Sequence, residues 1–158
     1  MAEGLTEQVI GLAIEVHRHT GRGLLESVYE RCLCYELREA GIPFERQVAI
    51  PVIYKSLAIG EGFKAAIVVA RGVILEIKAV AVILPVHEAQ LHTYLGMSGI
   101  RIGLILNFHA RRLVDDLRRY VVEPAPEPAA PTPVAHRGPL LVLRGKMRSR
   151  VWAPAPPA

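Results

Sequence analysis

The distribution of proline divides the chain near residue 122. Nine of the 12 prolines lie at position 124 or later, in a segment that begins EPAPEPAAPTP. Because proline lacks a backbone N–H and restricts φ, we expect this segment to be extended, without helix or sheet. Residues 123–158 are therefore predicted to be a Pro/Ala-rich, basic, disordered tail, and residues 1–122 must build the fold. The run LLVLRGKMRSRVW within the tail has three interpretations: docking on the domain, contact with nucleic acid, or no folded role.

The hydrophobic spacing changes from helical to strand-like within residues 1–122. Apolar residues recur every three or four positions up to Thr20, and again from about Leu24 to Ala40. Gly41 and Pro43 then end the second helix. Three β-branched runs, a helix that begins at a proline and a buried strand come next, at 44–54, 59–69, 73–80, 85–96 and 102–107. The order helix, helix, three-strand meander, helix, strand predicts an α/β protein with a mixed sheet.

Two segments carry alternatives. Pro51 lies within the first predicted strand and cannot donate a ladder hydrogen bond, which makes this strand an edge strand or an interrupted one. Residues 111–122 fit either a short helix or an edge strand. An edge strand there would present unpaired backbone groups, through which a homodimer could form.

Net charge does not by itself indicate a nucleic-acid-binding domain. Residues 124–158 hold five of the 19 basic residues and one of the 15 acidic residues, so the remaining 14 and 14 cancel in residues 1–123. Attraction of the domain to phosphate must therefore come from local clusters. Arg111-Arg112 and Arg118-Arg119 form a modest basic edge, of the kind that is usually only solvated.

The cellular setting follows from what the sequence lacks. No apolar segment approaches the roughly 20 residues that span a bilayer, and the start does not resemble a signal peptide, so we expect no membrane contact. Cys32 and Cys34 are two apart on a predicted helix and point in different directions, which favours two reduced thiols over a disulfide or a zinc site. A cytoplasmic protein is expected.

Glu76 and Lys78 are the first residues whose pattern suggests chemistry. Residues two apart on a strand face the same side, so both should project together while Ile77 enters the opposite layer. A metal-binding carboxylate beside an ammonium suits phosphodiester hydrolysis. The surrounding segment GVILEIKAV is otherwise apolar, and two charges there are costly unless they line a cleft. The alternative is a solvated ion pair.

Three further segments make a family resemblance. Gly23, Glu26 and Tyr29 spell the pattern GxxExxY, and LPVHEAQ at 84–90 and IGLILNF at 102–108 follow in order. Over about residues 4–122 the chain resembles the GxxExxY family, which is similar to the PD-(D/E)XK nucleases. The resemblance implies an α-β-β-β-α-β core and metal-dependent hydrolysis of DNA.

The resemblance also implies roles for individual residues. Glu26 and Glu76 would bind Mg²⁺ or Mn²⁺, and Lys78 would be the catalytic lysine. Gln90 and Tyr94 resemble the QxxxY motif of RecB-like nucleases, and their spacing places both on one helix face. Gln90 would position the lysine or the substrate, and Tyr94 would bind the substrate.

His87 lies near the site in the resemblance and is a candidate contact for phosphate or substrate. A satisfied surface histidine is the simpler interpretation. The other histidine pairs, His17 with His19 and His87 with His92, have spacings that place them on different helix faces, which argues against metal binding.

Ala66 departs from the family pattern, which has a metal-binding Asp at this position. A methyl group cannot coordinate Mg²⁺. Glu61 is five residues earlier, faces the other side and lies on the order of 16 Å away. Lys64 shares the face of Ala66, and we hypothesise that it pairs with Glu76. We therefore expect a nuclease-like protein with impaired hydrolysis, and an inactive relative would need no cofactor.

Two alternatives remain for a chain with this departure. One is a noncatalytic module that keeps the nuclease fold and binds nucleic acid or a protein. The other is a structural domain with a vestigial site.

Overall fold

A computed structural model describes residues 2–123, with the side chains of Ala2, Glu3 and Glu61 left out. The predictions for the tail after Glu123 lie outside the described residues. The elements are α1 (Ala2–Thr20), α2 (Glu26–Glu39), β1 (Phe44–Tyr54), β2 (Leu57–Val69), β3 (Val73–Lys78), α3 (Pro85–Ser98), β4 (Ile102–Asn107), a 3-10 helix η1 (Leu113–Asp116) and β5 (Leu117–Val121). The predicted order of helices and strands is confirmed.

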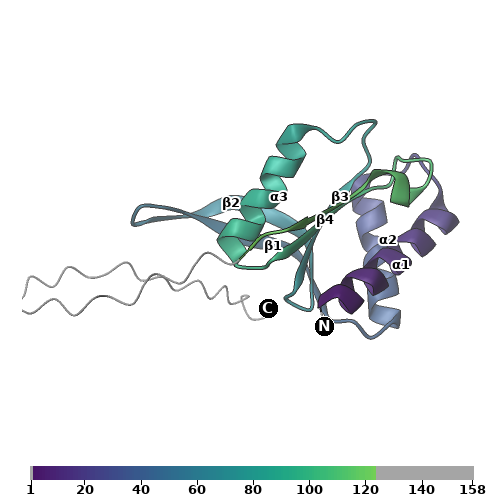
Figure 1. Cartoon of the computed structure of the whole chain (residues 1–158), viewed down its shortest axis with the longest axis horizontal. Coiled ribbons are helices and arrows are strands. Elements are labelled where there is room, and N and C mark those ends of the chain that lie inside the picture. Colours follow the sequence, from purple (N-terminus) through teal and green to yellow (C-terminus); the bar gives the residue numbers. More distant parts are fainter. Residues whose placement is uncertain (1, 124–158) are drawn as a thin grey trace, which may run out of the picture.

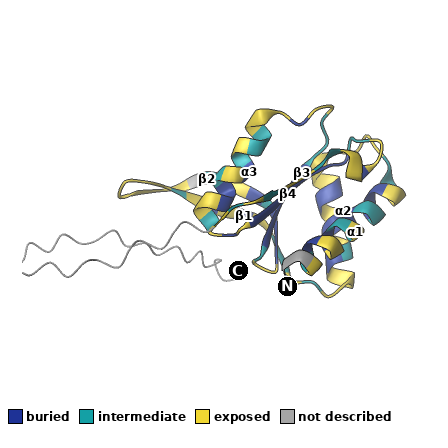
Figure 2. Cartoon of the chain, viewed as in Figure 1, coloured by how far each residue is buried: buried dark blue, intermediate teal, exposed yellow. Residues whose placement is uncertain are grey.

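The five strands form one mixed sheet in the order β1-β2-β3-β4-β5. β3 and β4 are parallel, with α3 as the connection between them, and the other neighbours are antiparallel. Helices α1 and α2 cover one face of the sheet and α3 covers the other (Figure 1). Each face has its own core, and the buried strands β3 and β4 lie between them (Figure 2).

The two cores separate the side chains of β3 by alternation. Val73, Leu75 and Ile77 belong to the core under α1 and α2, whereas Ile74 packs under α3. Glu76 follows Ile74 by two residues and therefore projects toward the α3 side. This arrangement places the only acidic residue of β3 at the end of a strand that is buried on both faces.

The segment 111–122 contains both of the predicted alternatives. Leu113–Asp116 forms η1, and Leu117–Val121 forms β5, which pairs with β4 at the edge of the sheet. Assembly of a homodimer through this edge stays a prediction.

Strand β1 is the other edge of the sheet, and its register shifts between Ile50 and Val52, as the proline at position 51 predicted. A second irregularity occurs at Gln47, which has a φ of 49°. The ladder pairs Arg46 with Ile67 and Val48 with Ala65, but it does not pair Gln47 with Ala66, the residue opposite it. Beyond this point β1 and β2 form a hairpin that extends away from the body of the molecule (Figure 1).

Candidate active site

The ion pair of Glu76 and Lys78 marks the C-terminal end of β3. Lys78 Nζ donates to Glu76 Oε1 at 2.8 Å, and both side chains are nearly buried, at 13% and 11% exposure for lysine and glutamate. Ile77 lies in the opposite core. The predicted geometry, with both charges on one side of the strand, is therefore confirmed.

The second carboxylate oxygen of Glu76 has no partner among the described residues. Oε2 is buried and accepts no hydrogen bond from the described residues. Burial raises the pKa of Glu76 above its ordinary value. The hydrogen bond and charge of Lys78 lower this pKa, the charge of Glu26 raises it, and the charge of His87 lowers it. A buried oxygen that lacks a donor is costly, so its retention suits an atom that meets a ligand.

Glu26 is the first residue of α2 and reaches the end of β3. Its Oε1 accepts a hydrogen bond from the backbone N–H of Ala79 at 3.2 Å. Its charge adds to the rise in the pKa of Glu76. The cluster therefore joins the start of α2 to the end of β3.

Tyr29 fixes the loop that presents Glu26. The buried Tyr29 hydroxyl donates to Gly21 O at 2.8 Å and accepts from Leu24 N at 3.1 Å. Its ring stacks on Phe108, with ring centroids 4.4 Å apart. Gly23 has a φ of 95°, a conformation that favours glycine. Gly23 and Tyr29 of the GxxExxY pattern are thus scaffold residues, and Glu26 is the one that faces the site.

Helix α3 contributes His87, Gln90 and Tyr94. His87 Nδ1 accepts from the backbone N–H of Leu84 at 3.1 Å, so the neutral ring carries its proton on Nε2. Tyr94 is buried against the edge of Phe63, and its pKa is raised by burial and by the charge of Glu76. Gln90 lies one turn before Tyr94 and is half-buried. Within residues 2–123 its side chain forms no hydrogen bond.

Asn107 was not singled out by the sequence analysis, yet it holds the end of β3 in place. Its Nδ2 donates to Val80 O at 2.8 Å and to Asp116 at 2.7 Å, and its Oδ1 accepts from Val80 N and from His109 N. The signal in the sequence was a single polar residue at the end of the apolar run IGLIL. Asn107 thereby fixes the segment that follows Lys78.

Ala66 lies on β2, the strand next to the one that carries Glu76. It immediately precedes Ile67, whose pair with Leu75 is the last of the β2–β3 ladder on the side of Glu76. It is partly buried and contacts the core under α1 and α2. The hypothesis that Lys64 pairs with Glu76 was wrong. Lys64 is exposed and pairs on the backbone with Ala49 of β1, and the ion pair of Glu76 is made by Lys78.

The part of the chain that the structure describes offers an incomplete donor set for a divalent metal. Glu26 and Glu76 supply two carboxylates, and no group of three or more His, Cys, Asp or Glu side chains among the described residues is placed to hold an ion. Mg²⁺ prefers six oxygen ligands in near-octahedral order. Glu76 Oε2 fits one such ligand, but the described residues do not form a complete metal site.

The remaining sequence predictions concern cysteines and membranes. Cys32 and Cys34 are both free thiols, and burial raises the pKa of Cys34 to about 11. Among the described helices, none is long and apolar enough to cross a membrane.

Comparison with protein families matches residues 3–120 to the PD-(D/E)XK nuclease superfamily. Neither the curated proteins nor the solved structures gave a match. The more specific GxxExxY resemblance is compatible with the family match and stays a prediction. The matched region reaches from the first turn of α1 into β5 and includes all the candidate site residues, so the chain belongs to the PD-(D/E)XK nuclease superfamily.

Proposed function

We propose that the chain binds a nucleic-acid phosphodiester at the cluster of Glu26, Glu76 and Lys78, and that Ala66 leaves it impaired in metal-dependent hydrolysis. One observation carries the proposal: Glu76 Oε2 is buried beside an ammonium and has no partner within residues 2–123. A carboxylate kept in this state suits an oxygen that coordinates a cation, and the superfamily to which the chain belongs supports that chemistry.

The chain's own residues have separate roles in this proposal. Lys78 would stabilise the negative charge that develops on the phosphate, since it is positioned within a nearly dry site. His87 Nε2–H would donate to a phosphate oxygen, and Gln90 and Tyr94 would position the substrate or the lysine. A bound Mg²⁺ or Mn²⁺ would supply Lewis-acid activation of water, but two carboxylates alone would hold it weakly.

The alternative is a noncatalytic module that binds nucleic acid. This alternative is favoured by one observation: no three His, Cys, Asp or Glu side chains among the described residues are placed to hold a metal ion. The two functions differ in one property, whether the native chain hydrolyses a phosphodiester at all.

The test compares Ala66→Asp with the native chain. Mg²⁺ and Mn²⁺ binding would be measured by calorimetry, and cleavage by assays on plasmid and single-stranded oligonucleotides. Ala66→Asp should increase metal affinity about tenfold or more, because ligand number and charge set the affinity of such sites. It should also produce cleavage that Glu76→Gln removes.

The matched control is Ala58→Asp, which adds the same charge to an exposed position of β2. Metal binding that rises equally in both Asp variants would contradict the proposed site. Cleavage by the native chain that is lost in Glu76→Gln would show that position 66 does not limit catalysis, and would refute the proposed impairment.

A further inference from the structure

Four arginines line a cavity of about 590 Å³ between the C-terminal part of α1 and the start of η1. They are Arg18, Arg22, Arg111 and Arg112, and the apolar lining includes Ile14, Leu113 and Val114. Among the described residues, no Asp or Glu side chain lines this cavity. In a domain with balanced charge, this arginine cavity is a local concentration of positive charge.

Within residues 2–123, two of these arginines form side-chain hydrogen bonds or an ion pair and two do not, although the charge of Arg111 acts on Asp115. Arg22 Nε donates to His109 O at 2.6 Å, and Arg112 forms an ion pair with Asp115 at 2.6 Å. Arg18 and Arg111 are exposed, and neither forms an ion pair or side-chain hydrogen bond within residues 2–123. An unpaired guanidinium presents a planar set of donors that matches phosphate oxygens.

Short connections link the arginine cavity to the candidate active site. Arg22 fixes His109, and the preceding residue, Phe108, donates its backbone N–H to Lys78 O at 2.8 Å. A second connection runs along the chain: Arg22 is four residues before Glu26, in the loop that the Tyr29 hydroxyl holds. The cavity and the carboxylates therefore lie at the same end of the β3–β4 pair.

We infer that the arginine cavity binds the backbone of the nucleic acid at phosphates next to the one that meets Glu26, Glu76 and Lys78. Arg18 and Arg111 make the phosphate contacts, while Arg22 and Arg112 shape the cavity. This inference rests on the proposed recognition of a phosphodiester. It gives Arg111 and Arg112 a role in binding. From the sequence alone, they were not distinguishable from arginines that only contact solvent.

The test measures the salt dependence of oligonucleotide binding by the full-length chain. Fluorescence anisotropy with labelled single- and double-stranded oligonucleotides gives the slope of log affinity against log salt. Each phosphate contact contributes about 1 to this slope, so the double variant Arg18→Ala/Arg111→Ala should reduce its magnitude by about 2. The basic residues after position 123 are present in every variant and do not affect the comparison.

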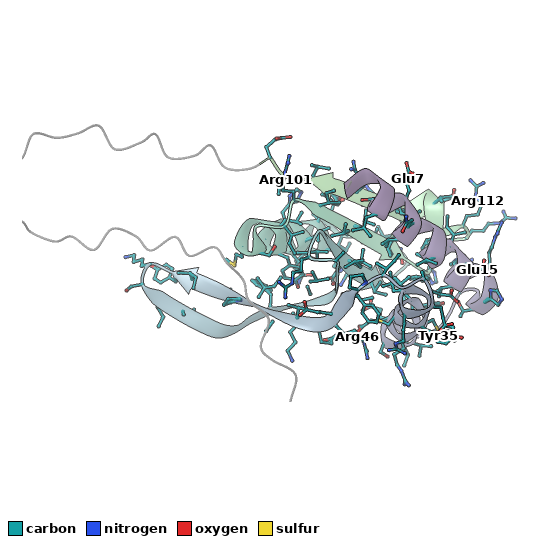
Figure 3. All side chains as sticks on the ribbon, turned by 90° about the horizontal axis from the view of Figure 1, so that it is seen from below. Glu7, Glu15, Tyr35, Arg46, Arg101 and Arg112 are labelled. Carbon is teal, nitrogen blue, oxygen red and sulfur yellow. The ribbon has the colours of Figure 1, made fainter. Side chains whose placement is uncertain are left out.

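The matched control is Arg31→Ala/Arg38→Ala, which removes two exposed arginines from another cavity, between α2 and its neighbours. Figure 3 shows Tyr35 and Arg46, which line that other cavity, well apart from Arg112, which projects outward beside α1. Equal losses in both double variants would mean that only bulk charge matters, and would overturn the inference.

Three further outcomes decide the matter. An unchanged slope in Arg18→Ala/Arg111→Ala, or no oligonucleotide binding by the native chain, would also overturn the inference. Saturable binding of inorganic phosphate that the double variant loses, with an unchanged oligonucleotide slope, would assign the cavity to a small anion instead. Metal binding by Ala66→Asp tests the proposed function without these arginines, so the two proposals can fail separately.

Discussion

Lys78 donates to one oxygen of Glu76 at 2.8 Å, while the other oxygen of the same carboxylate is buried and has no partner in the described part of the chain. Only one of the two carboxylate oxygens therefore has a hydrogen-bond donor among the described residues. Burial raises its pKa, and the neighbouring ammonium reduces that rise. The two effects make separate predictions, one for each residue of the pair.

Glu76→Gln should change how stability depends on pH. Because the pKa of Glu76 in the folded chain lies above 4.5, the folded chain keeps this proton in a range where the unfolded chain has lost it. The stability contributed by the protonated carboxyl is complete below about pH 4.5 and is lost as pH rises through the folded-state pKa. The free energy of unfolding of the native chain, minus that of Glu76→Gln, should therefore fall across this window.

Urea unfolding of both proteins over a pH series would measure this difference. Lys78, Glu26 and His87, whose charges act on the carboxyl, are present in both proteins. A difference that rises with pH in the same window would mean that the ammonium outweighs burial, and would reverse the direction given above.

Lys78→Met should widen that pH window. Removal of the ammonium leaves burial and the charge of Glu26 opposed only by the smaller effect of His87, so the pKa of Glu76 should rise further. In the same unfolding series, the loss of stability should continue to higher pH than in the native chain. Lys64→Met is the control, because Lys64 is exposed and outside the Glu76 ion pair. An equal shift in both variants would contradict the assignment of Lys78.

The helices and strands of this protein were largely predictable from hydrophobic spacing. The strand limits 44–54 and 102–107 agree with β1 and β4, because alternating or continuous apolar runs bounded by turns have few other folded states. The same-side placement of Glu76 and Lys78 also followed from strand geometry alone. Local periodicity was sufficient for each of these features.

The backbone pairing of Lys64 with β1, and its lack of an ion pair with Glu76, were not predictable. Both depend on the residue at which the pairing of β2 with β3 ends. The prediction required β2 to continue beside β3, but that pairing ends at Ile67. Nearby, Gln47 adopts a φ of 49° that no glycine signals in the sequence, and the regular pairing of β1 with β2 is interrupted opposite Ala66. The contacts of Asn107 likewise join residues 27 positions apart. Such features depend on tertiary packing.

Tyr29→Phe tests the loop that presents Glu26. The variant keeps the ring stacked on Phe108 but removes the hydroxyl that bonds Gly21 and Leu24. The free energy of unfolding should fall by about 1–3 kcal/mol, since buried polar groups lose their partner. Tyr35→Phe, on an exposed position of the same helix, should change it by less than about 0.5 kcal/mol. Chemical denaturation would measure both, and similar values for the two variants would show that the hydroxyl bonds do not hold the loop.

Gly103→Ala tests how closely α3 packs on the sheet. A Cβ at Gly103 would lie 2.8–2.9 Å from three atoms of the buried Leu91 side chain, which is closer than carbon atoms approach. The variant should lose about 1–3 kcal/mol of stability through overpacking. Gly96→Ala, where nothing lies within 4 Å, should gain about 0.5–1 kcal/mol from helix propensity.

A double-mutant cycle identifies Leu91 as the cause. Leu91→Ala alone should cost about 2–5 kcal/mol, because it leaves a cavity in the core under α3. In Gly103→Ala/Leu91→Ala the added methyl occupies part of that cavity, so the loss should be smaller than the sum of the single losses. Additive losses would place the strain elsewhere. Gln90 and Tyr94 lie on the same helix as Leu91, so the cycle measures the packing of the element that carries them.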